Sequence, residues 1–370
     1  VVMNKKKIIS FYVFLFLLFL GWGLIVQPLN ADEVWNYGFA HNVYKGLIPY
    51  KDFNMVLTPF FPFIMSLGFY LFGSSMLVLH IENALMLTIM IYLVSLFLDK
   101  NHALVILFLF FPLPLLFPSY NLMILFLFIL LLVLEKKEKN DYVIGMVIGL
   151  CILTKQSVGV PFILPSLIYG KNLSKIGKRF LGMCGPLFVF FIYLLITNSF
   201  MSFLDLCFLG LFDFAEKNHA SFNVYYIFPF LFIGILVFCL KKQPKNIFNY
   251  YGLAFLSMIL PLFDAYHTQV AFIGVLVILL SNLKKDLRIY SYVFVFVTIF
   301  SLGVLILNER QGKVIYPNDI PHFEYKFLEE DTVQFTKEIS RYIQENEGKE
   351  FVFLSANGYY IRLTNDMPIT

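Results

Sequence analysis

The chain has 370 residues, of which 59% are hydrophobic and 14% are charged, and its formal net charge at pH 7 is +4. Soluble domains carry about 25% charged residues, and the mean hydropathy here is +0.77. These values exclude an ordinary soluble protein and predict an all-α polytopic membrane protein. Most lysines lie in short clusters between apolar runs, which is typical of cytoplasmic loops, so we expect membrane lipids and no nucleic acid as partners.

The first apolar run extends from Ile8 to Val26 and follows three lysines at 5–7. The apolar core of a signal peptide is shorter, about 7–15 residues, and a small-x-small cleavage site follows it. This run is long enough to span a bilayer and ends in Gln27-Pro28-Leu29-Asn30. We therefore expect an uncleaved first span with a cytoplasmic N-terminus.

The first polar loop, residues 31–53, reads ADEVWNYGFAHNVYKGLIPYKDF. Its stretch from Glu33 to Gly46 predicts an amphipathic juxtamembrane helix with Trp35 as an interface anchor. The side chains expected to face lipid are Val34, Tyr37 and Phe39 or Ala40. Asp32 is placed to cap this helix, which would hold its carboxylate at the boundary between water and lipid.

Asp32 and Glu33 are the catalytic candidates, because a carboxylate at the outer surface can act as a general base. The alternative is a helix cap that adds only solubility. The pair also has the oxygen ligands to hold a divalent cation, but we expect no resident metal or other cofactor. Tyr50, Lys51 and Asp52 are candidates for substrate binding, with Lys51 facing a phosphate and Asp52 orienting it; the alternative is a solvated loop pair.

Ten further apolar segments follow, and basic clusters separate several of them. They span about 57–73, 75–98, 103–118, 121–134, 142–169, 180–199, 222–240, 246–263, 265–283 and 289–307. If every segment crosses once, the basic loop 135–141 falls outside, against the positive-inside rule. Two changes restore the rule: 57–73 lies in the outer interface, and 142–169 forms two short spans that meet near Lys155. The result is about eleven transmembrane helices, with the C-terminus outside and Tyr120, Lys155 and His267 on the same side as Asp32.

Ionisable groups at membrane depth are costly and mark functional sites. Lys155 lies near the middle of its apolar run, and a cation there with Gln156 beside it would suit a phosphate. Asp264 and His267 are three residues apart, on one face of a helix, and can bind a sugar, a phosphate or a metal, or simply cap the turn. Glu82 lies near the outer end of a predicted span and is a weaker candidate for the same cavity.

The composition divides the chain into a transmembrane domain at 1–307 and a short extracytoplasmic tail at 308–370. The tail has a helical pattern near 331–346 and a strand-like stretch at 351–354. It is too short for a secure core of its own and stops soon after the strand, as an incomplete domain would. The four cysteines have no paired spacing, and no Walker loop, dinucleotide fingerprint, nucleophile elbow or zinc-protease motif is present, which argues against a cytosolic ATPase or a soluble hydrolase.

The layout resembles the GT-C superfamily of membrane glycosyltransferases, in the branch of the protein O-mannosyltransferases and the aminoarabinose transferases of lipid A. The matching residues are Asp32-Glu33, Gly46, Pro49-Tyr50, Asp52-Phe53 and Pro59 in the first loop, Gly149 to Lys155 in a second stretch, and Asp264 to His267 in a third. The chain departs from the family in its short tail and in His80-Ile81, where an arginine is often found.

The resemblance implies an inverting glycosyltransferase that moves a sugar from a polyprenyl-phosphate donor to a glycan, lipid or protein acceptor of the cell envelope. The short loops and the Lys-rich, Phe-rich composition suggest a bacterial plasma membrane. It implies that Asp32 is the base and that Lys155 binds the lipid phosphate. Two alternatives stay open, a flippase or exporter of lipid-linked glycans and a glycan polymerase. A transporter would place its polar residues near the bilayer midplane, whereas most here fall at the predicted outer boundary.

Overall fold

The computed structural model describes residues 5–27, 29–98, 117–169, 172–210, 227–260, 265–282, 315–316, 319–351, 357–365 and 367. Most of these residues are helical. The elements are α1 (Lys5–Gly21), a π-helical turn (Trp22–Val26), α2 (Ala31–Tyr44), α3 (Phe60–Phe72), α4 (Met76–Phe97), α6 (Tyr120–Lys136), α7 (Asp141–Thr154), α8 (Gln156–Gly159), a 3-10 turn (Val160–Phe162), α9 (Ile163–Tyr169), α10 (Leu173–Ile196), α11 (Phe200–Leu204), a second π-helical turn (Asp205–Leu209), α13 (Ile227–Lys242), α14 (Ile247–Phe255), a second 3-10 turn (Leu256–Ile259), α15 (Ala265–Asn282), β1 (Ile315–Tyr316), β2 (Leu328–Glu329), α17 (Glu330–Glu345) and α18 (Asn357–Thr364).

Within the described ranges, three helices are long and apolar enough to cross a membrane: Lys6–Val26, Met76–Phe97 and Leu173–Ile196. Several shorter apolar helices stand beside them, so the chain is a mostly helical membrane protein, in agreement with the predicted class. The total of eleven spans stays a prediction, because the predicted spans 103–118 and 289–307 lie outside the described residues.

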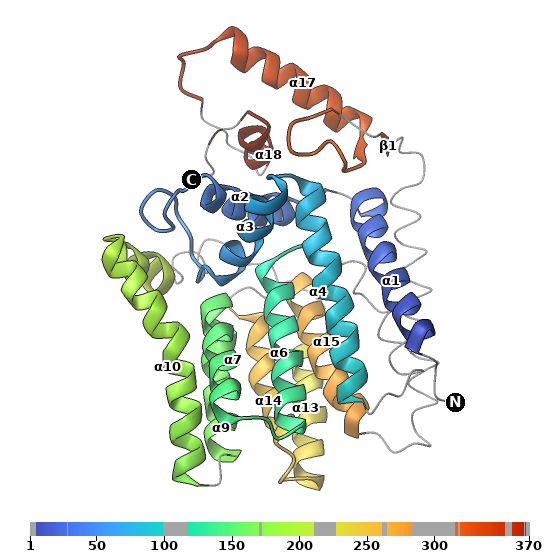
Figure 1. Cartoon of the computed structure of the whole chain (residues 1–370), viewed down its shortest axis with the longest axis vertical. Helices are drawn as coiled ribbons and strands as arrows, with labels where there is room; N and C mark the ends of the chain where they lie inside the picture. Colours follow the sequence, from blue (N-terminus) through green and yellow to red (C-terminus); the bar gives the residue numbers. More distant parts are fainter. Residues whose placement is uncertain are drawn as a thin grey trace.

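The long helices stand side by side along the long axis of the molecule, while α2 and α3 lie at one end of this bundle (Figure 1). The tail helices α17 and α18 lie beyond α2, so we call this end of the bundle the tail end. α3 has 13 residues, or about 20 Å of helix, too short for a hydrocarbon core about 30 Å thick. Its length agrees with the predicted interfacial position of segment 57–73.

The opposite end, which we call the basic end, gathers the lysine-bearing loops. Lys136 at the end of α6 donates to the carbonyl of Phe97 at the end of α4. Asn246 at the start of α14 donates to the side chain of Asn282 at the end of α15, at 2.8 Å. The loops that follow α6 and α13 therefore lie at one end, as the predicted topology requires.

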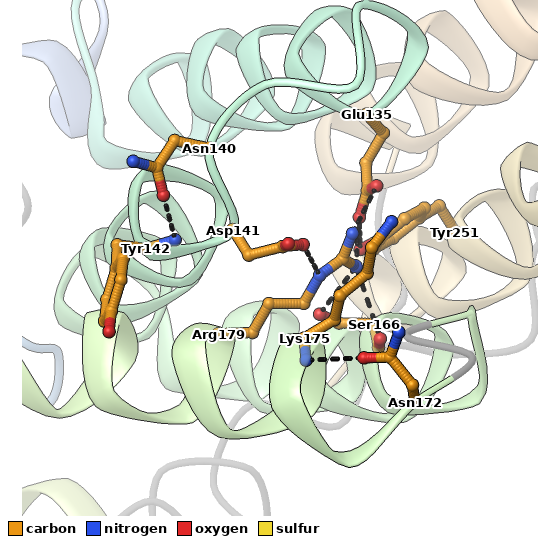
Figure 2. Close-up of polar contacts among 9 residues, drawn as sticks. All are labelled: Glu135, Asn140, Asp141, Tyr142, Ser166, Asn172, Lys175, Arg179 and Tyr251. Carbon is orange, nitrogen blue, oxygen red and sulfur yellow. Dashed lines mark hydrogen bonds and ion pairs between the residues drawn. The ribbon is translucent and has the colours of Figure 1, made fainter.

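A buried ionic network joins five helices at the basic end (Figure 2). Arg179 of α10 donates from its two terminal nitrogens to the two oxygens of Glu135 of α6, at 2.7 and 3.0 Å, and from Nε to Asp141 of α7, at 2.8 Å. Tyr251 of α14 donates to Glu135 at 2.8 Å, and Ser166 of α9 accepts from Arg179 at 3.3 Å. Such a forked pairing fixes both geometry and register.

The predicted break of segment 142–169 is confirmed at Lys155. α7 ends at Thr154, and Lys155 adopts an extended backbone with φ −153° and ψ 101° before α8 begins. Gly159 then packs so closely on the backbone of Ile152 that a Cβ would overlap it, so the chain turns back along α7. Both α7 and α9 reach the ionic network, which places Lys155 between them at the tail end.

The expectation that α2 presents an apolar face to lipid is wrong. Val34, Tyr37, Phe39 and Ala40 are all buried at 2% exposure or less. The Tyr37 ring packs against Phe69 of α3 and against Phe323 of the tail, with ring centroids 5.3 and 6.1 Å apart. The reason is that other parts of the chain cover the sides of the helix that the sequence assigns to lipid: α3 and the tail cover Tyr37, and the loop containing Phe53 covers Phe39.

The tail contains the predicted helix, observed as α17, and a further helix, α18, that the sequence did not indicate. Its strands β1 and β2 pair antiparallel, with Ile315 opposite Glu329 and Tyr316 opposite Leu328. The strand-like stretch 351–354 lies largely outside the described residues, and Phe351 itself is not in a strand.

Candidate functional site

The first turn of α2 separates its two neighbouring carboxylates. Asn30, and not Asp32 as predicted, is the N-cap, and its side chain accepts from the Asp32 backbone N–H at 2.8 Å. Asp32 therefore lies inside the first turn with its side chain exposed, whereas Glu33 is fully buried. Because the N-terminal end of a helix is electropositive, it stabilises the negative charge of Asp32.

Glu33 is bound on both sides by basic groups. Its Oε1 lies 2.6 Å from His80 Nε2 of α4 and 3.3 Å from Lys326 Nζ of the tail. Burial alone would raise the pKa of Glu33, but the charge of Lys326 and the contact with His80 outweigh burial and hold the pKa below its ordinary value. Glu33 is therefore a paired anion that joins α2 to α4 and to the tail.

Sequence reasoning missed Lys326, which is fully buried and lies 293 residues away from Glu33 in the chain. Its ammonium also donates to the carbonyl of Gly23, at the end of the first span. The His80 ring packs against Gly23 and fills the space that a Cβ at this position would need. The only local signal was a single lysine between Phe323 and Phe327 in an otherwise apolar and acidic stretch.

Lys155 is held at the break between α7 and α8 with only 2% of its surface exposed. Its ammonium donates to the side-chain oxygen of Asn121 at 3.0 Å and to the carbonyl of Met258 at 3.4 Å. It also lies 5.5 Å from the centre of the Tyr120 ring. A lysine buried in this way is weakly screened by solvent, so its charge acts strongly on nearby anions.

The N-terminus of α6 connects the surroundings of Asp32 with those of Lys155. Asn36 of α2 accepts from the Tyr120 backbone N–H at 3.2 Å, and Trp35 packs against the Tyr120 ring. Tyr266 at the start of α15 shares a hydrogen bond of 2.7 Å with Ser119, the residue that precedes α6. The predicted placement of Tyr120 and Lys155 at the same end as Asp32 is thus confirmed.

His267, which follows Tyr266, is buried at 6% exposure and packs edge-on against the Tyr266 ring. It therefore belongs to the same end of the bundle as Asp32 and Lys155, as predicted. Asp264, its predicted partner, lies outside the described residues.

Gln156 connects the helix break to the loop that precedes α3. Its amide donates to the carbonyls of Val56 and Cys207, at 3.3 and 3.1 Å. In the same loop Tyr50 has a left-handed backbone, with φ 67°, and its hydroxyl donates to the carbonyl of Leu57 at 2.6 Å. A left-handed conformation is rare for a bulky side chain and concentrates at functional loops.

The remaining members of that loop and Glu82 stand apart from the Asp32 cluster. Asp52 accepts from the backbone N–H of Ile48 at 2.7 Å and so closes its own turn, and Lys51 is exposed. Glu82 points at Gly68 of α3, where a Cβ would collide with its carboxylate. The structure thus places Glu82 between α3 and α4, while its neighbour His80 faces Glu33.

The described residues contain no group of three or more His, Cys, Asp and Glu side chains that could hold a metal ion. Asp32 and Glu33 do not converge on one point, because the Glu33 oxygens face Lys326 and His80. A divalent cation would therefore have to use Asp32 with groups other than Glu33. The metal requirement stays a prediction.

Comparison with known proteins gives two similar solved structures, both of the Archaeoglobus fulgidus oligosaccharyltransferase. One, in complex with Zn and sulfate, is 13% identical with a TM-score of 0.48, covering 96% of this chain and 61% of the other. The second, tethered to an acceptor peptide containing the NVT sequon, is 12% identical with a TM-score of 0.46, covering 98% of this chain and 64% of the other. This chain therefore spans less than two thirds of the length of these structures, and a similarity of this size supports neither a shared fold nor a shared function.

No protein-family model and no curated protein sequence matches the chain. The fold thus defines the chain as a helical membrane protein. Its exposed Asp32 and its buried Lys155 lie at the same end of the helix bundle.

Proposed function

We propose that the protein is a membrane-embedded glycosyltransferase that moves a sugar from a polyprenyl-phosphate donor to an acceptor hydroxyl at the outer face of the plasma membrane. The supporting observation is that Lys155 and the helical turn that bears the exposed Asp32 both contact the N-terminus of α6. In this proposal the basic end faces the cytoplasm, in accordance with the positive-inside rule, and the tail end faces outward.

Asp32 is the general base of the proposed reaction. It accepts the proton of the acceptor hydroxyl while the acceptor oxygen bonds to the anomeric carbon of the donor sugar. The bond between that carbon and the phosphate oxygen breaks, and the lipid phosphate leaves with the electron pair. The exposed position of Asp32 suits this task, whereas Glu33 is buried and its oxygens contact Lys326 and His80.

Lys155 and the N-terminus of α6 stabilise the departing phosphate. α6 has 17 residues, and the positive end of its dipole lies where Tyr120 and Asn121 meet the ammonium of Lys155. Charges that are fixed before the reaction need no reorganisation when the phosphate becomes more negative. No nucleotide site is needed, because the lipid phosphate is itself the leaving group.

The test compares a strain that lacks the protein after complementation with the wild-type chain, with Asp32→Asn or with Asp319→Asn. Asp319 is a matched control, because it is an exposed carboxylate of the tail and pairs with Lys337. Sugar composition of the envelope and the pool of polyprenyl-linked sugars are measured in each strain. We expect Asp32→Asn to remove one surface sugar and to raise its lipid-linked form, while Asp319→Asn behaves as the wild type.

Full rescue by Asp32→Asn would refute a catalytic role for Asp32 and would favour the transport alternative. In that case the strain that lacks the protein should hold the lipid-linked sugar on the cytoplasmic leaflet, because no flippase is present to move it outward.

A further inference from the structure

Asn36 lies in the second turn of α2 and is almost completely buried, with 1% of its surface exposed. Its side-chain Nδ2 donates to the main-chain carbonyl of Asp32 at 2.7 Å. Its Oδ1 accepts from the backbone N–H of Tyr120, the first residue of α6, at 3.2 Å. A single amide therefore joins the turn that bears Asp32 directly to the start of α6.

The two hydrogen bonds of Asn36 require a side chain that donates at one end and accepts at the other. A backbone N–H can only donate and a carbonyl can only accept, and an asparagine amide supplies both of the groups that they need. A buried amide is costly unless it is hydrogen-bonded, and these two contacts meet that condition. Asparagine is also unfavourable inside a helix, so its presence here indicates a specific task for the side chain.

The contact falls at the part of α6 that also binds Lys155. The first N–H groups of a helix have no partner within the helix, and the N–H of Tyr120 finds its partner in Asn36. The next residue, Asn121, accepts from the ammonium of Lys155 at 3.0 Å. Two consecutive residues of α6 thus connect α2 with the buried lysine.

The position of Asp32 relative to α6 depends on this contact. Residues four apart lie on one face of a helix, so Asp32 lies on the face of α2 that Asn36 turns toward α6. The Trp35 ring also touches the Tyr120 ring edge-on, with centroids 6.4 Å apart. A ring contact of this kind permits sliding, whereas a hydrogen bond weakens steeply when its angle changes. Because α2 lies at the end of the bundle and not within it (Figure 1), directed contacts are needed to fix its distance from α6.

We propose that Asn36 is a positioning residue for sugar transfer, which holds the turn that bears Asp32 at a fixed separation from Lys155. The inference rests on the proposed function and adds a residue that touches neither substrate. In the proposed reaction the acceptor oxygen bonds to the anomeric carbon as the lipid phosphate leaves, so the base and the cation act on the two ends of one displacement. A misplacement of about 1 Å can lower the rate of such a reaction about 100-fold.

The test measures the rate of sugar transfer by the full chain in liposomes. The donor is the polyprenyl-linked sugar fraction from the strain that lacks the protein, and the acceptor is the envelope fraction of that strain. We expect Asn36→Ala to lower the maximal rate per folded molecule about 10- to 100-fold and to leave the half-saturating amount of the donor fraction unchanged. Asn42→Ala is the matched control, because Asn42 is a second asparagine of α2 with 1% exposure, and its rate per folded molecule should equal that of the wild type.

A second pair of variants removes the same hydrogen bond from the side of α6. Tyr120→Pro deletes the N–H that Asn36 accepts from, and proline is favoured at the first position of a helix. Tyr120→Ala is its reference, because it also lacks the ring but keeps the N–H. We expect Tyr120→Pro to be slower than Tyr120→Ala by about the factor that Asn36→Ala costs, and the addition of Asn36→Ala to Tyr120→Pro to cause no further loss.

Four results would overturn the inference: a normal rate per folded molecule in Asn36→Ala, a change in half-saturation alone, equal rates in Tyr120→Pro and Tyr120→Ala, or additive losses in the double variant. If Asn36→Ala does not fold, the two Tyr120 variants decide the question. Normal transfer by Asp32→Asn would refute the proposed reaction. Loss of transfer in Asp32→Asn, together with normal transfer in Asn36→Ala, would refute only the role of Asn36.

Discussion

The two ends of the helix bundle both contain buried cations, but the cations have different surroundings. At the basic end, Arg179 contacts two carboxylates, a hydroxyl and a carbonyl from neighbouring helices. At the tail end, the contacts of Lys155 with described residues include an amide, a carbonyl and an aromatic ring, and the acid Asp32 is exposed.

The difference indicates how each end is used. A cation bound directly by carboxylates has its charge neutralised within the protein, so the Arg179 network is suited to holding helices together. At the tail end, a buried lysine lies beside a helix N-terminus and an acid lies at the protein surface, so a ligand at that surface would meet both groups. We expect substitutions at the basic end to affect mainly stability and those at the tail end to affect mainly sugar transfer.

The largest expected effect on stability comes from Arg179→Met. The substitution leaves Glu135 and Asp141 without their guanidinium partner, and breaking a buried pair in this way costs about 3–5 kcal/mol. We expect the variant to lose most of its folded, monodisperse protein, as measured by thermal unfolding and size-exclusion chromatography in detergent.

The matched control for Arg179→Met is Lys175→Met, one turn earlier on α10, where the side chain is exposed. Its unfolding temperature is expected to equal that of the wild type. Equal shifts in the two variants would show that the network of Figure 2 does not hold the helices together.

These contrasts also show which parts of the molecule the sequence could predict. The break at Lys155 was predictable, because a charge in the middle of an apolar run is costly unless the run is interrupted there. The role of Glu33 was not predictable, because its partners lie 47 and 293 residues further along the chain. The lipid-facing assignment of Tyr37 failed for the same reason, since local periodicity cannot reveal that a distant tail covers the helix.

The groove between α2 and the tail helices was likewise beyond sequence reasoning. Asn30 and Tyr360 line it from opposite ends of the chain, and no local pattern connects them. In contrast, the exposed acid at the start of α2 follows from its position directly after the first span. Short-range features of the site were therefore predictable, whereas its long-range closure by the tail was not.

The next prediction concerns the tail end, where Lys155→Met should reduce sugar transfer far more than stability. Loss of a preorganised charge that stabilises a developing anion lowers turnover by about 10²–10³-fold. We expect a loss of the surface sugar with accumulation of its lipid-linked form, and an unfolding temperature much closer to the wild type than that of Arg179→Met.

Lys136→Met is the control for Lys155→Met, because Lys136 also lies over an aromatic ring but at the basic end. It should leave transfer unchanged. Normal transfer in the Lys155 variant would remove Lys155 from the proposed mechanism. The buried cations at the two ends of the bundle would then not differ in their effect on sugar transfer.

A smaller effect is expected from the Glu33 pair as the pH falls. The pKa of Glu33 in the folded protein lies below its ordinary value of 4.5 because Lys326 and His80 outweigh the effect of burial. The stabilisation from this carboxylate is therefore complete above pH 4.5 and is lost as the pH falls through the folded-state pKa. We expect the unfolding temperature of the wild type to drop by roughly a few degrees across this acidic range.

Glu33→Gln tests this assignment, because an amide of the same shape cannot titrate there. Its unfolding temperature should be lower than that of the wild type at pH 7 and should lack the corresponding acidic decline. A decline of equal size in both proteins would assign the pH dependence to other carboxylates and not to the contact between α2 and the tail.

The smallest effect is expected from the surface pair of Lys337 and Asp319. Their charged atoms are 2.6 Å apart, closer than the 3.3 Å between Lys326 and Glu33, but the side chains are 52% and 76% exposed. Lys337 lowers the pKa of Asp319 by a hydrogen bond, yet solvent screens such exposed pairs so that they stabilise proteins little. Lys337→Met should leave the unfolding temperature unchanged, whereas Lys326→Met, which strands a buried carboxylate, should lower it clearly. If the two substitutions shifted it equally, distance and not burial would decide the strength of ion pairs in the tail, and the tail would lose its assigned role in holding α2 in place.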